Sequence, residues 1–247
     1  MSLVPLLLKR GHQVIALSRS SQKAKQLEAL GAKVAVADVF DMDGLTAAIK
    51  KAGPEVVIHE LTALTGVANS KKLDEELALT NRLRTEVTDI LLSAARLVGA
   101  RRFIAQSFCG WPFAREGGPI KTEQDPLDPN APDNFRKSLA AISYLESVVS
   151  KATDLEALAL RYGFFYGPGT STAKNGATVE LIRKRRIPSF RHNSATLTSP
   201  RKPFSTIRIF SSLAYFFRVR RLISRTTASA SALSAMALTL NCEVVFG

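Results

Sequence analysis

Apolar positions along the chain fall into short runs and longer periodic stretches. Five short runs of the kind that forms buried strands lie near residues 13–18, 33–37, 55–59, 102–106 and 155–160. Between and around them, apolar residues recur at helical spacing, which predicts helices at 3–10, 21–30, 43–51, 71–98, 135–151 and 177–185. Short apolar strands that alternate with helices indicate βαβ units, and hence an α/β fold with a parallel sheet covered on both faces.

This pattern stops after Pro188. Beyond it, Ser, Thr, Arg and isolated aromatic residues dominate, and only a basic amphipathic helix at 204–219, suited to a membrane surface, can be suggested. We therefore divide the chain into an α/β domain, residues 1–188, and a divergent basic tail, residues 189–247. A shifted reading frame or a wrongly assigned gene end would produce such a change, so we expect the tail to be disordered or non-native.

The net charge of +13 comes almost entirely from residues 181–242, which reach from the end of the domain into the tail. Residues 181–242 hold twelve of the 34 Lys and Arg residues and none of the 21 Asp and Glu residues. The remaining chain is close to neutral, and no nucleic-acid motif accompanies the basic tail. We therefore expect neither nucleic acid nor a membrane as partner. The run at 204–219 is also too interrupted by charge to span a membrane.

Cysteine usage bears on metals and on location. Cys109 and Cys242 have neither a metal-ligand spacing nor the density of a disulfide scaffold. We expect no metal site and a reducing compartment, the cytoplasm. The apolar run at residues 3–8 is followed rather than preceded by basic residues, which is the reverse of a signal peptide.

Short motifs follow the predicted strands in a consistent order. They are Arg19-Ser20-Ser21, Asp38-Val39-Phe40-Asp41, His59-Glu60-Leu61-Thr62-Ala63-Leu64, Asn81, Gln106-Ser107 and the run from Leu160 to Gly169. Each motif alone recurs by chance, but their colinear order within a βαβ pattern is specific. Through them, residues 3–188 resemble the NAD-dependent epimerase/dehydratase family of extended or atypical short-chain dehydrogenases. The resemblance implies a Rossmann-like doubly wound parallel sheet, a nicotinamide cofactor and a small-molecule substrate.

The end of the first predicted strand bears on the choice of cofactor. In Rossmann-like domains an acidic residue at this place holds the ribose 2′-hydroxyl of NAD, whereas an Arg accommodates the 2′-phosphate of NADP. This chain has Arg19 and Ser20 there and no acid. We therefore predict that NADP is preferred to NAD. A solvated charge at a strand end is the alternative interpretation of Arg19.

The resemblance implies roles for residues after the next two strands. Asp38 and Val39 would recognise the adenine ring, although Asp38 could equally close a turn. Leu61 and Thr62 would pass along the ribose and phosphate of the cofactor, and Thr62 could equally be an ordinary loop residue. These four residues, with Arg19 and Ser20, are expected to bind the nucleotide.

Three further residues are matched nearer the substrate. Asn81 would help to hold the active site, Tyr162 would begin the turn that approaches the nicotinamide, and Ser107 would polarise a substrate carbonyl or alcohol. Ser107 is the catalytic candidate, and it is expected just past the fourth strand. The alternatives are an exposed Asn in a helix and a Ser that serves only the loop.

Two departures from the family pattern bear on activity. The chain begins inside the helix that would follow the glycine-rich turn, so we expect exposed sheet edges and no phosphate cradle. The acid/base Tyr of the family and its Lys align with Ser138 and Ile142, neither of which can replace them. Tyr144 lies nearby, but Val148 stands four residues later, so we expect Tyr144 to pack rather than to catalyse.

These observations predict an NAD(P)-dependent, epimerase/dehydratase-like oxidoreductase that prefers NADP and has little or no dehydrogenase activity. A non-catalytic or degenerate nucleotide-binding scaffold is the alternative. A basic surface-binding protein that acts through residues 181–225 is the least favoured interpretation, because no recognised nucleic-acid motif accompanies that stretch. The sequence carries no indication of the oligomeric state.

Overall fold

The elements of the chain alternate as the apolar pattern predicts. A computed structural model describes residues 3–64, 72–108, 113–114, 116–117, 121–163, 170–171, 173–184 and 243–246. The strands are β1 (Val14–Ser18), β2 (Lys33–Val36), β3 (Val56–His59), β4 (Arg102–Phe108), β5 (Glu156–Tyr162) and β6 (Glu243–Phe246). The helices are α1 (Leu3–Lys9), α2 (Ser21–Ala29), α3 (Met42–Ala52), α4 (Leu73–Glu76), α5 (Ala78–Arg82), the π-helix η2 (Leu83–Val87), α6 (Thr88–Leu97), the 3₁₀-helix η3 (Asp133–Phe135), α7 (Arg136–Ser150) and α8 (Ala177–Arg183).

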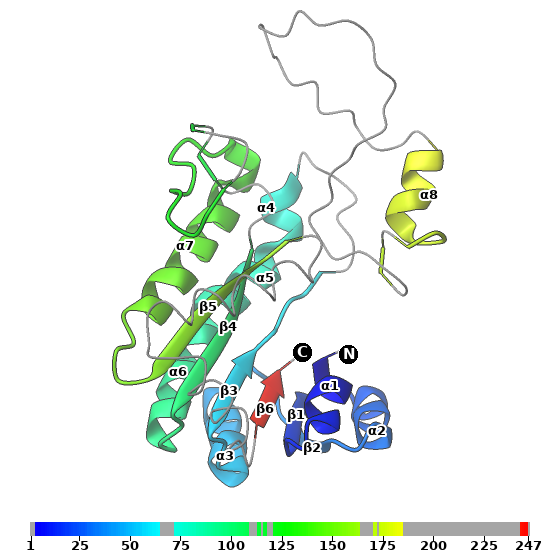
Figure 1. Ribbon diagram of the computed structural model, residues 1–247, viewed down its shortest axis with the longest axis vertical. Coiled ribbons are helices and arrows are strands. Elements are labelled where there is room, and N and C mark those ends of the chain that lie inside the picture. Colours follow the sequence, from blue (N-terminus) through cyan, green and yellow to red (C-terminus); the bar gives the residue numbers. More distant parts are fainter. Residues whose placement is uncertain are drawn as a thin grey trace, which may run out of the picture. The chain divides into compact units, whose positions relative to one another are not determined.

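In the described part of the chain, six strands form one sheet in the order β2-β1-β6-β3-β4-β5, and each pairing between them is parallel (Figure 1). The α/β class and the parallel, Rossmann-like sheet are thus confirmed. Because the strands run in one direction, their carboxyl ends share one edge of the sheet, where ligands of doubly wound folds bind. β4 and β5 extend two residues beyond their predicted ends.

The centre of the sheet differs from the expectation. β6 lies between β1 and β3, and Glu243 stands opposite both Val14 and Val56. The open edges expected from the sequence are therefore wrong, because both rows of backbone groups beside the central position are paired. Two facing strand edges accept any extended segment that supplies complementary N–H and C=O groups, and the β-branched residues Val244 and Val245 favour an extended backbone.

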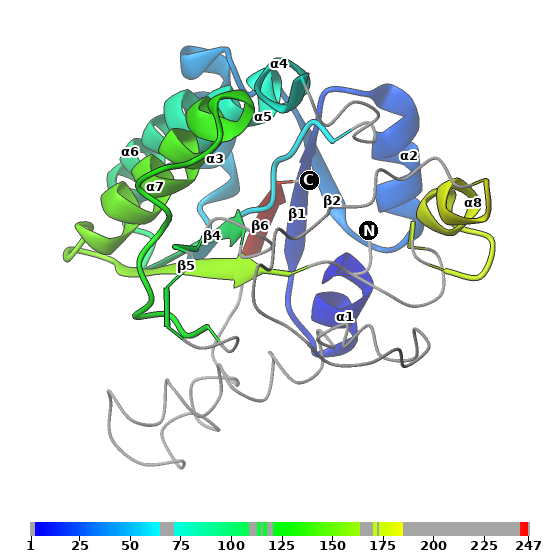
Figure 2. The same ribbon diagram turned by 90° about the horizontal axis from the view of Figure 1, so that it is seen from above.

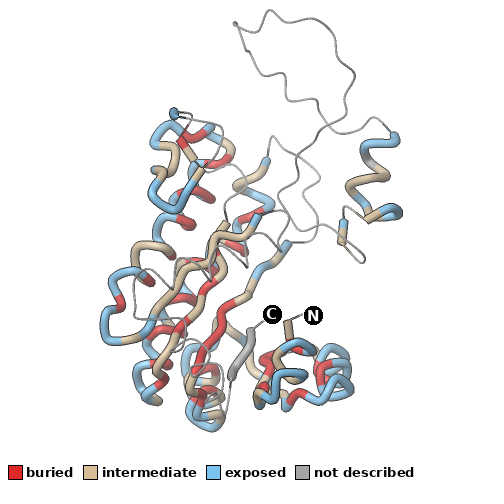
Figure 3. Tube along the Cα trace, in the orientation of Figure 1, coloured by how far each residue is buried: buried red, intermediate tan, exposed pale blue. Residues whose placement is uncertain are grey.

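Helices cover both faces of the sheet, with α3, α6 and α7 on one side and α1 on the other (Figure 2). The first face packs around Val57, Phe103 and Ala105, which are fully buried. The second face packs Val4 of α1 and Leu27 of α2 against the opposite sides of the same strands. Burial accordingly concentrates on the strands and the inner helix surfaces (Figure 3).

Local hydrogen bonds from side chains to the backbone mark where helix α2 begins and where the helical stretch before α6 is interrupted. Ser20 caps α2 by accepting from the N–H of Lys23, as expected of an N-cap that contributes about 1 kcal/mol. The single helix predicted at 71–98 is instead divided into α4, α5, η2 and α6. Within it, the Thr85 and Thr88 hydroxyls donate to backbone carbonyls of the preceding turn, and such bonds bend helices.

The chain divides into two compact units, residues 1–162 with 231–247 and residues 163–230. In the second unit, helix α8 is described, and the suggested helix at 204–219 lies outside the described residues. The division at residue 188 stays a prediction. In the part of the chain that the structure describes, no helix has the length and apolarity needed to cross a membrane.

Candidate active site

Polar residues gather at the carboxyl edge of the sheet, and those after β1 are arranged by the turn into α2. The Ser18 hydroxyl donates to the carbonyl of Ser20 at 3.2 Å, which holds this turn. Arg19 is exposed between these two serines, and no hydrogen bond or ion pair is found for it among the described residues. Its guanidinium therefore has all its donors available at the place where the nucleotide ribose binds in this kind of fold.

Asp38 and Val39 follow β2 in the loop before α3. The carboxylate of Asp38 accepts from the N–H of Phe40 at 3.0 Å, so it closes a turn, as the alternative interpretation anticipated. Val39 packs against the core around α3 and α6. The turn leaves Asp38 exposed, and its assignment to adenine recognition stays a prediction.

The segment after β3 is anchored by a buried histidine. His59 accepts from the N–H of Leu61 at Nδ1 and donates from Nε2 to the carbonyl of Leu83 at 3.3 Å. Burial lowers the pKa of His59 to about 4, with a smaller contribution from the charge of Arg84. His59 is thus neutral and structural. It holds Leu61, which the exposed Thr62 follows, and the contact of both residues with a cofactor stays a prediction.

Glu60 is a candidate that the sequence reasoning missed. The hydroxyl of Tyr162, the last residue of β5, donates to Oε1 of Glu60 at 2.9 Å. Burial raises the pKa of Glu60 to about 7, and the bond from Tyr162 lowers it by less. An acidic residue placed directly after the buried strand β3 was the signal available in the sequence, because such a position is unfavourable for a charge.

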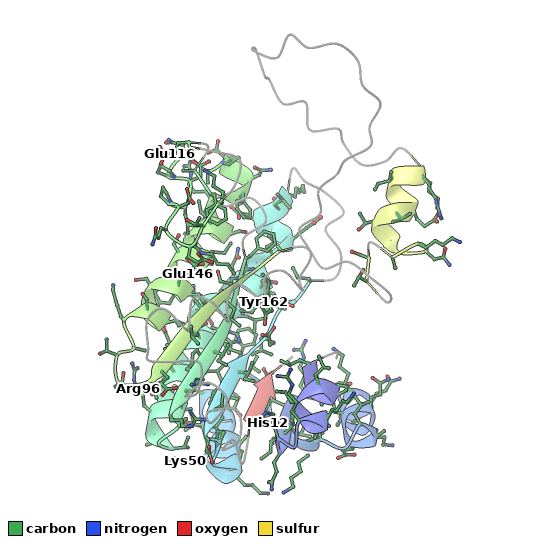
Figure 4. The ribbon with its side chains drawn as sticks, viewed as in Figure 1. His12, Lys50, Arg96, Glu116, Glu146 and Tyr162 are labelled. Carbon is green, nitrogen blue, oxygen red and sulfur yellow. The ribbon has the colours of Figure 1, made fainter. Side chains whose placement is uncertain are left out.

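Ser107 lies within β4 rather than past its end, and it is buried. Its hydroxyl donates to Oε1 of Glu146 on α7 at 2.6 Å. Arg161 of β5 donates to both oxygens of the same carboxylate, each at 2.8 Å. Figure 4 labels Glu146 on α7 and Tyr162 at the end of β5. The substrate contact proposed for Ser107 stays a prediction, and in this arrangement its proton is committed to Glu146.

The two positions of the absent acid/base pair face the interior. Ser138 is fully buried, donates to Asp74 at 2.6 Å and accepts from Nδ2 of Asn81 at 3.0 Å. Ile142 is also buried. Ser138 therefore joins helix α7 to helices α4 and α5, and neither residue can supply a proton to a ligand.

Asn81 has one unused group. Its Oδ1 atom is buried and has no hydrogen-bond partner among the described residues. Asn81 lines a pocket of about 330 Å³ together with Asp74, Glu75, Ala78 and Lys137. A buried acceptor without a partner is costly in a folded protein, and a ligand donor is one way to satisfy it. The role of Asn81 in holding the active site stays a prediction.

Tyr144 lies on the outer side of α7. Its hydroxyl donates to Asp89 of α6 at 2.6 Å, and the residue is 39% exposed. The neighbouring carboxylate bond, with a smaller effect of burial, raises the pKa of Tyr144. Tyr144 therefore links two helices at the exposed surface, whereas the sequence predicted that it packs.

Comparison with known proteins assigns the family. A model of the NAD dependent epimerase/dehydratase family matches residues 2–192. The chain belongs to this family. A curated family relative, the 3-diazoavenalumate denitrifying reductase of a Streptomyces species, is 41% identical over 187 residues, which cover 75% of this chain and 59% of that protein. The chain thus spans less than two thirds of that relative's length.

Solved structures share the fold. UDP-glucose 4-epimerase of Thermotoga maritima, determined with UDP-glucose, is 24% identical with a TM-score of 0.53, covering 68% of this chain and 52% of that one. The Bordetella bronchiseptica enzyme WbmH in complex with NAD⁺ is 14% identical with a TM-score of 0.54, covering 75% and 59%. At these identities the likeness concerns the fold alone.

The family is NAD-dependent, and the described residues fit one end of such a cofactor. Arg19 offers free donors after β1, and the orphaned Oδ1 of Asn81 offers an acceptor; their contact with a cofactor stays a prediction. Strand β6 ends at Phe246, and Gly247 lies outside the described residues. The remainder of the Tyr162–Gly169 turn lies outside the described residues.

Proposed function

We propose that this chain is an NAD(P)-dependent reductase of small molecules that binds NADP in preference to NAD. The main observation in its support is Arg19, an exposed guanidinium just after β1, where a protein that binds NAD would have an acidic residue. A guanidinium matches a phosphate with two parallel donors. The name of the curated relative, a reductase, supports the direction of the reaction.

The other cofactor contacts in this proposal follow the carboxyl edge of the sheet. Ser20 would lie beside the ribose, Asp38 and Val39 beside the adenine, and Leu61 and Thr62 along the phosphates and second ribose. The cofactor would supply two electrons and a hydrogen to the substrate. These side chains and backbone groups would orient it, and the substrate would lie toward Asn81 and Ser107. We further propose a cytoplasmic location, since neither cysteine has a disulfide-type spacing.

Calorimetric titration of NADP and NAD tests the proposal. The wild-type chain should bind NADP more tightly, and Arg19→Ala should weaken NADP binding by about tenfold or more, because hydrogen bonds to charged groups contribute about 1.5–3 kcal/mol. NAD affinity should change little. Arg10→Ala is the matched control, since Arg10 is also exposed but precedes β1 at the opposite end of the sheet. Equal binding of both cofactors by the wild type would refute the preference.

A second candidate function is a nucleotide-binding scaffold without catalysis. The burial of Ser138 and Ile142 supports it, because no proton donor stands at the positions where the family has its Tyr and Lys. NADPH oxidation measured with benzaldehyde and with an aromatic diazo compound separates the two candidates. The diazo compound is included because the curated relative is named for one. NADPH binding without oxidation by either acceptor would favour the scaffold.

A further inference from the structure

Glu60 and Tyr162 come from strands that are not adjacent, yet they meet at the carboxyl edge. The last register pair of β3 with β4 is His59 with Ala105, so Glu60 lies one residue beyond it. Tyr162 is the last residue of β5 and pairs with Phe108. Side chains alternate along strands, so Glu60 lies on the opposite face from His59. The hydroxyl of Tyr162 crosses β4 to reach the carboxylate at 2.9 Å.

The ionisable groups around Glu60 leave its charge uncompensated. Its bonded partner on β5 is the neutral phenol of Tyr162, and its neighbour on β3 is the neutral imidazole of His59. On β4, Gln106 follows the last residue that pairs with β3, and Phe108 pairs with Tyr162; neither carries a charge. Arg161 binds Glu146 instead. Among the described residues, no ion pair reaches Glu60, so the loss of hydration dominates and the carboxyl group is poised to take up or release a proton near neutral pH.

We propose that Glu60 exchanges a proton with the bound substrate and that Tyr162 is the residue that positions it. This inference rests on the proposed reductase function and supplies the group that Ser138 and Ile142 cannot provide. In the donating direction, the O–H bond of the Glu60 carboxylic acid breaks and its electron pair stays on Glu60. A new O–H bond forms on the substrate oxygen. The carboxylate of Glu60 that results regains its proton from water.

Tyr162 is suited to position Glu60 rather than to replace it. Burial, with the adjacent carboxylate contributing less, raises the pKa of Tyr162, so its hydroxyl keeps its proton across the neutral range. A hydroxyl that stays protonated continues to donate to Glu60 and fixes the rotamer of the carboxyl group. The oxygen Oε1 is held by Tyr162 at 2.9 Å.

The test measures two properties of the full-length chain in Glu60→Gln, Tyr162→Phe and Tyr144→Phe. The first property is the carboxyl pKa by NMR of protein labelled with ¹³C at glutamate side chains. The second is the pH profile of kcat/KM for NADPH-dependent reduction of benzaldehyde. Tyr144→Phe is the matched control, because it removes another bond from a tyrosine to a carboxylate, at the exposed surface of α7.

In the wild type, one glutamate should titrate near pH 7 and be absent from Glu60→Gln. Reduction needs the protonated acid, so kcat/KM should fall as the pH rises through that value. Glu60→Gln should lower kcat/KM roughly 10²-fold, which is the lower end of the range for a general acid, and should abolish its fall with pH. Tyr162→Phe removes the bond that stabilises the carboxylate, so the NMR midpoint and the fall of kcat/KM should both move to higher pH. Tyr144→Phe should change neither.

Failures of the two proposals are distinguishable. Turnover by the wild type with an unchanged rate and pH profile in Glu60→Gln would overturn the role of Glu60 alone. The role of Glu60 would also be overturned if, in Tyr162→Phe, the fall of kcat/KM with pH does not move together with the NMR midpoint. NADPH binding without turnover would overturn both the reductase function and the proton transfer, and would leave only cofactor binding intact. Absence of NADPH binding would overturn the proposed function itself.

Discussion

Two partly buried carboxylates near the carboxyl edge of the sheet have contrasting surroundings. Glu146 lies on the face covered by α7, where Arg161 binds both its oxygens and Ser107 donates a third hydrogen bond. Glu60 receives its hydrogen bond from a neutral phenol. A guanidinium in two-point contact compensates the charge that burial makes costly, whereas a neutral donor compensates it only in part. The first arrangement joins a helix to two strands, and the second leaves a proton free to move.

Breaking the first cluster should have the largest effect. In Arg161→Met, the carboxylate of Glu146 stays buried without its cation, and the free energy of unfolding should fall by about 3–5 kcal/mol. The side chains of Arg161 and Glu146 are 15% and 17% exposed, so solvent screens the pair little. Urea denaturation measures the loss. The double variant with Glu146→Gln should recover much of it, and a loss of the same size in the double variant would contradict this explanation.

Removing the third bond should have an intermediate effect. Ser107→Ala deletes the hydroxyl that donates to Glu146, and a hydrogen bond to a charged group contributes about 1.5–3 kcal/mol to stability. Ser107→Thr keeps a hydroxyl and serves as the control. NADPH affinity should be unchanged in folded Ser107→Ala. If kcat for benzaldehyde falls in the folded variant, Ser107 has the substrate contact that the family resemblance implies; an unchanged kcat would limit Ser107 to the structural cluster.

The smallest effect concerns the pH dependence of stability. The pKa of Glu60 is raised in the folded chain from 4.5 to about 7, so its contribution is fully present below 4.5 and is lost as the pH rises through 7. The pKa of His59 is lowered from 6.5 to about 4, so its contribution is present above 6.5 and is lost as the pH falls through 4. Between 4.5 and 6.5 the two dependences oppose each other.

Glu60→Gln should therefore reveal the pH dependence of stability that His59 causes. The free energy of unfolding of this variant should rise with pH between about 4.5 and 6.5 more steeply than that of the wild type. Urea denaturation at several pH values measures both slopes, with Tyr144→Phe as the control that should follow the wild type. Identical slopes in Glu60→Gln and the wild type would show that Glu60 titrates at its ordinary pKa.

The residues differ in how far the sequence could place them. Arg19 and Asp38 were located because each follows a strand that its own apolar run predicts, and the register of a parallel sheet brings strand ends to one edge. Ser107 was predicted just past the end of its strand but lies within it, since β4 continues to Phe108. Glu60 was passed over, because an acidic residue after a strand has meaning only when its burial and its partner are known.

The sequence by itself determined the α/β class, the approximate strands and helices, and the absence of a Tyr and Lys at positions 138 and 142. These follow from local periodicity and residue identity, which do not depend on distant parts of the chain. Only the tertiary structure decided the partners. Tyr162 meets Glu60 across 102 residues of sequence, Asn81 meets Ser138 across 57, and β6 enters the sheet between β1 and β3. Such contacts depend on how packed layers and strand order bring separate segments together. A local sequence pattern does not specify which distant residues meet.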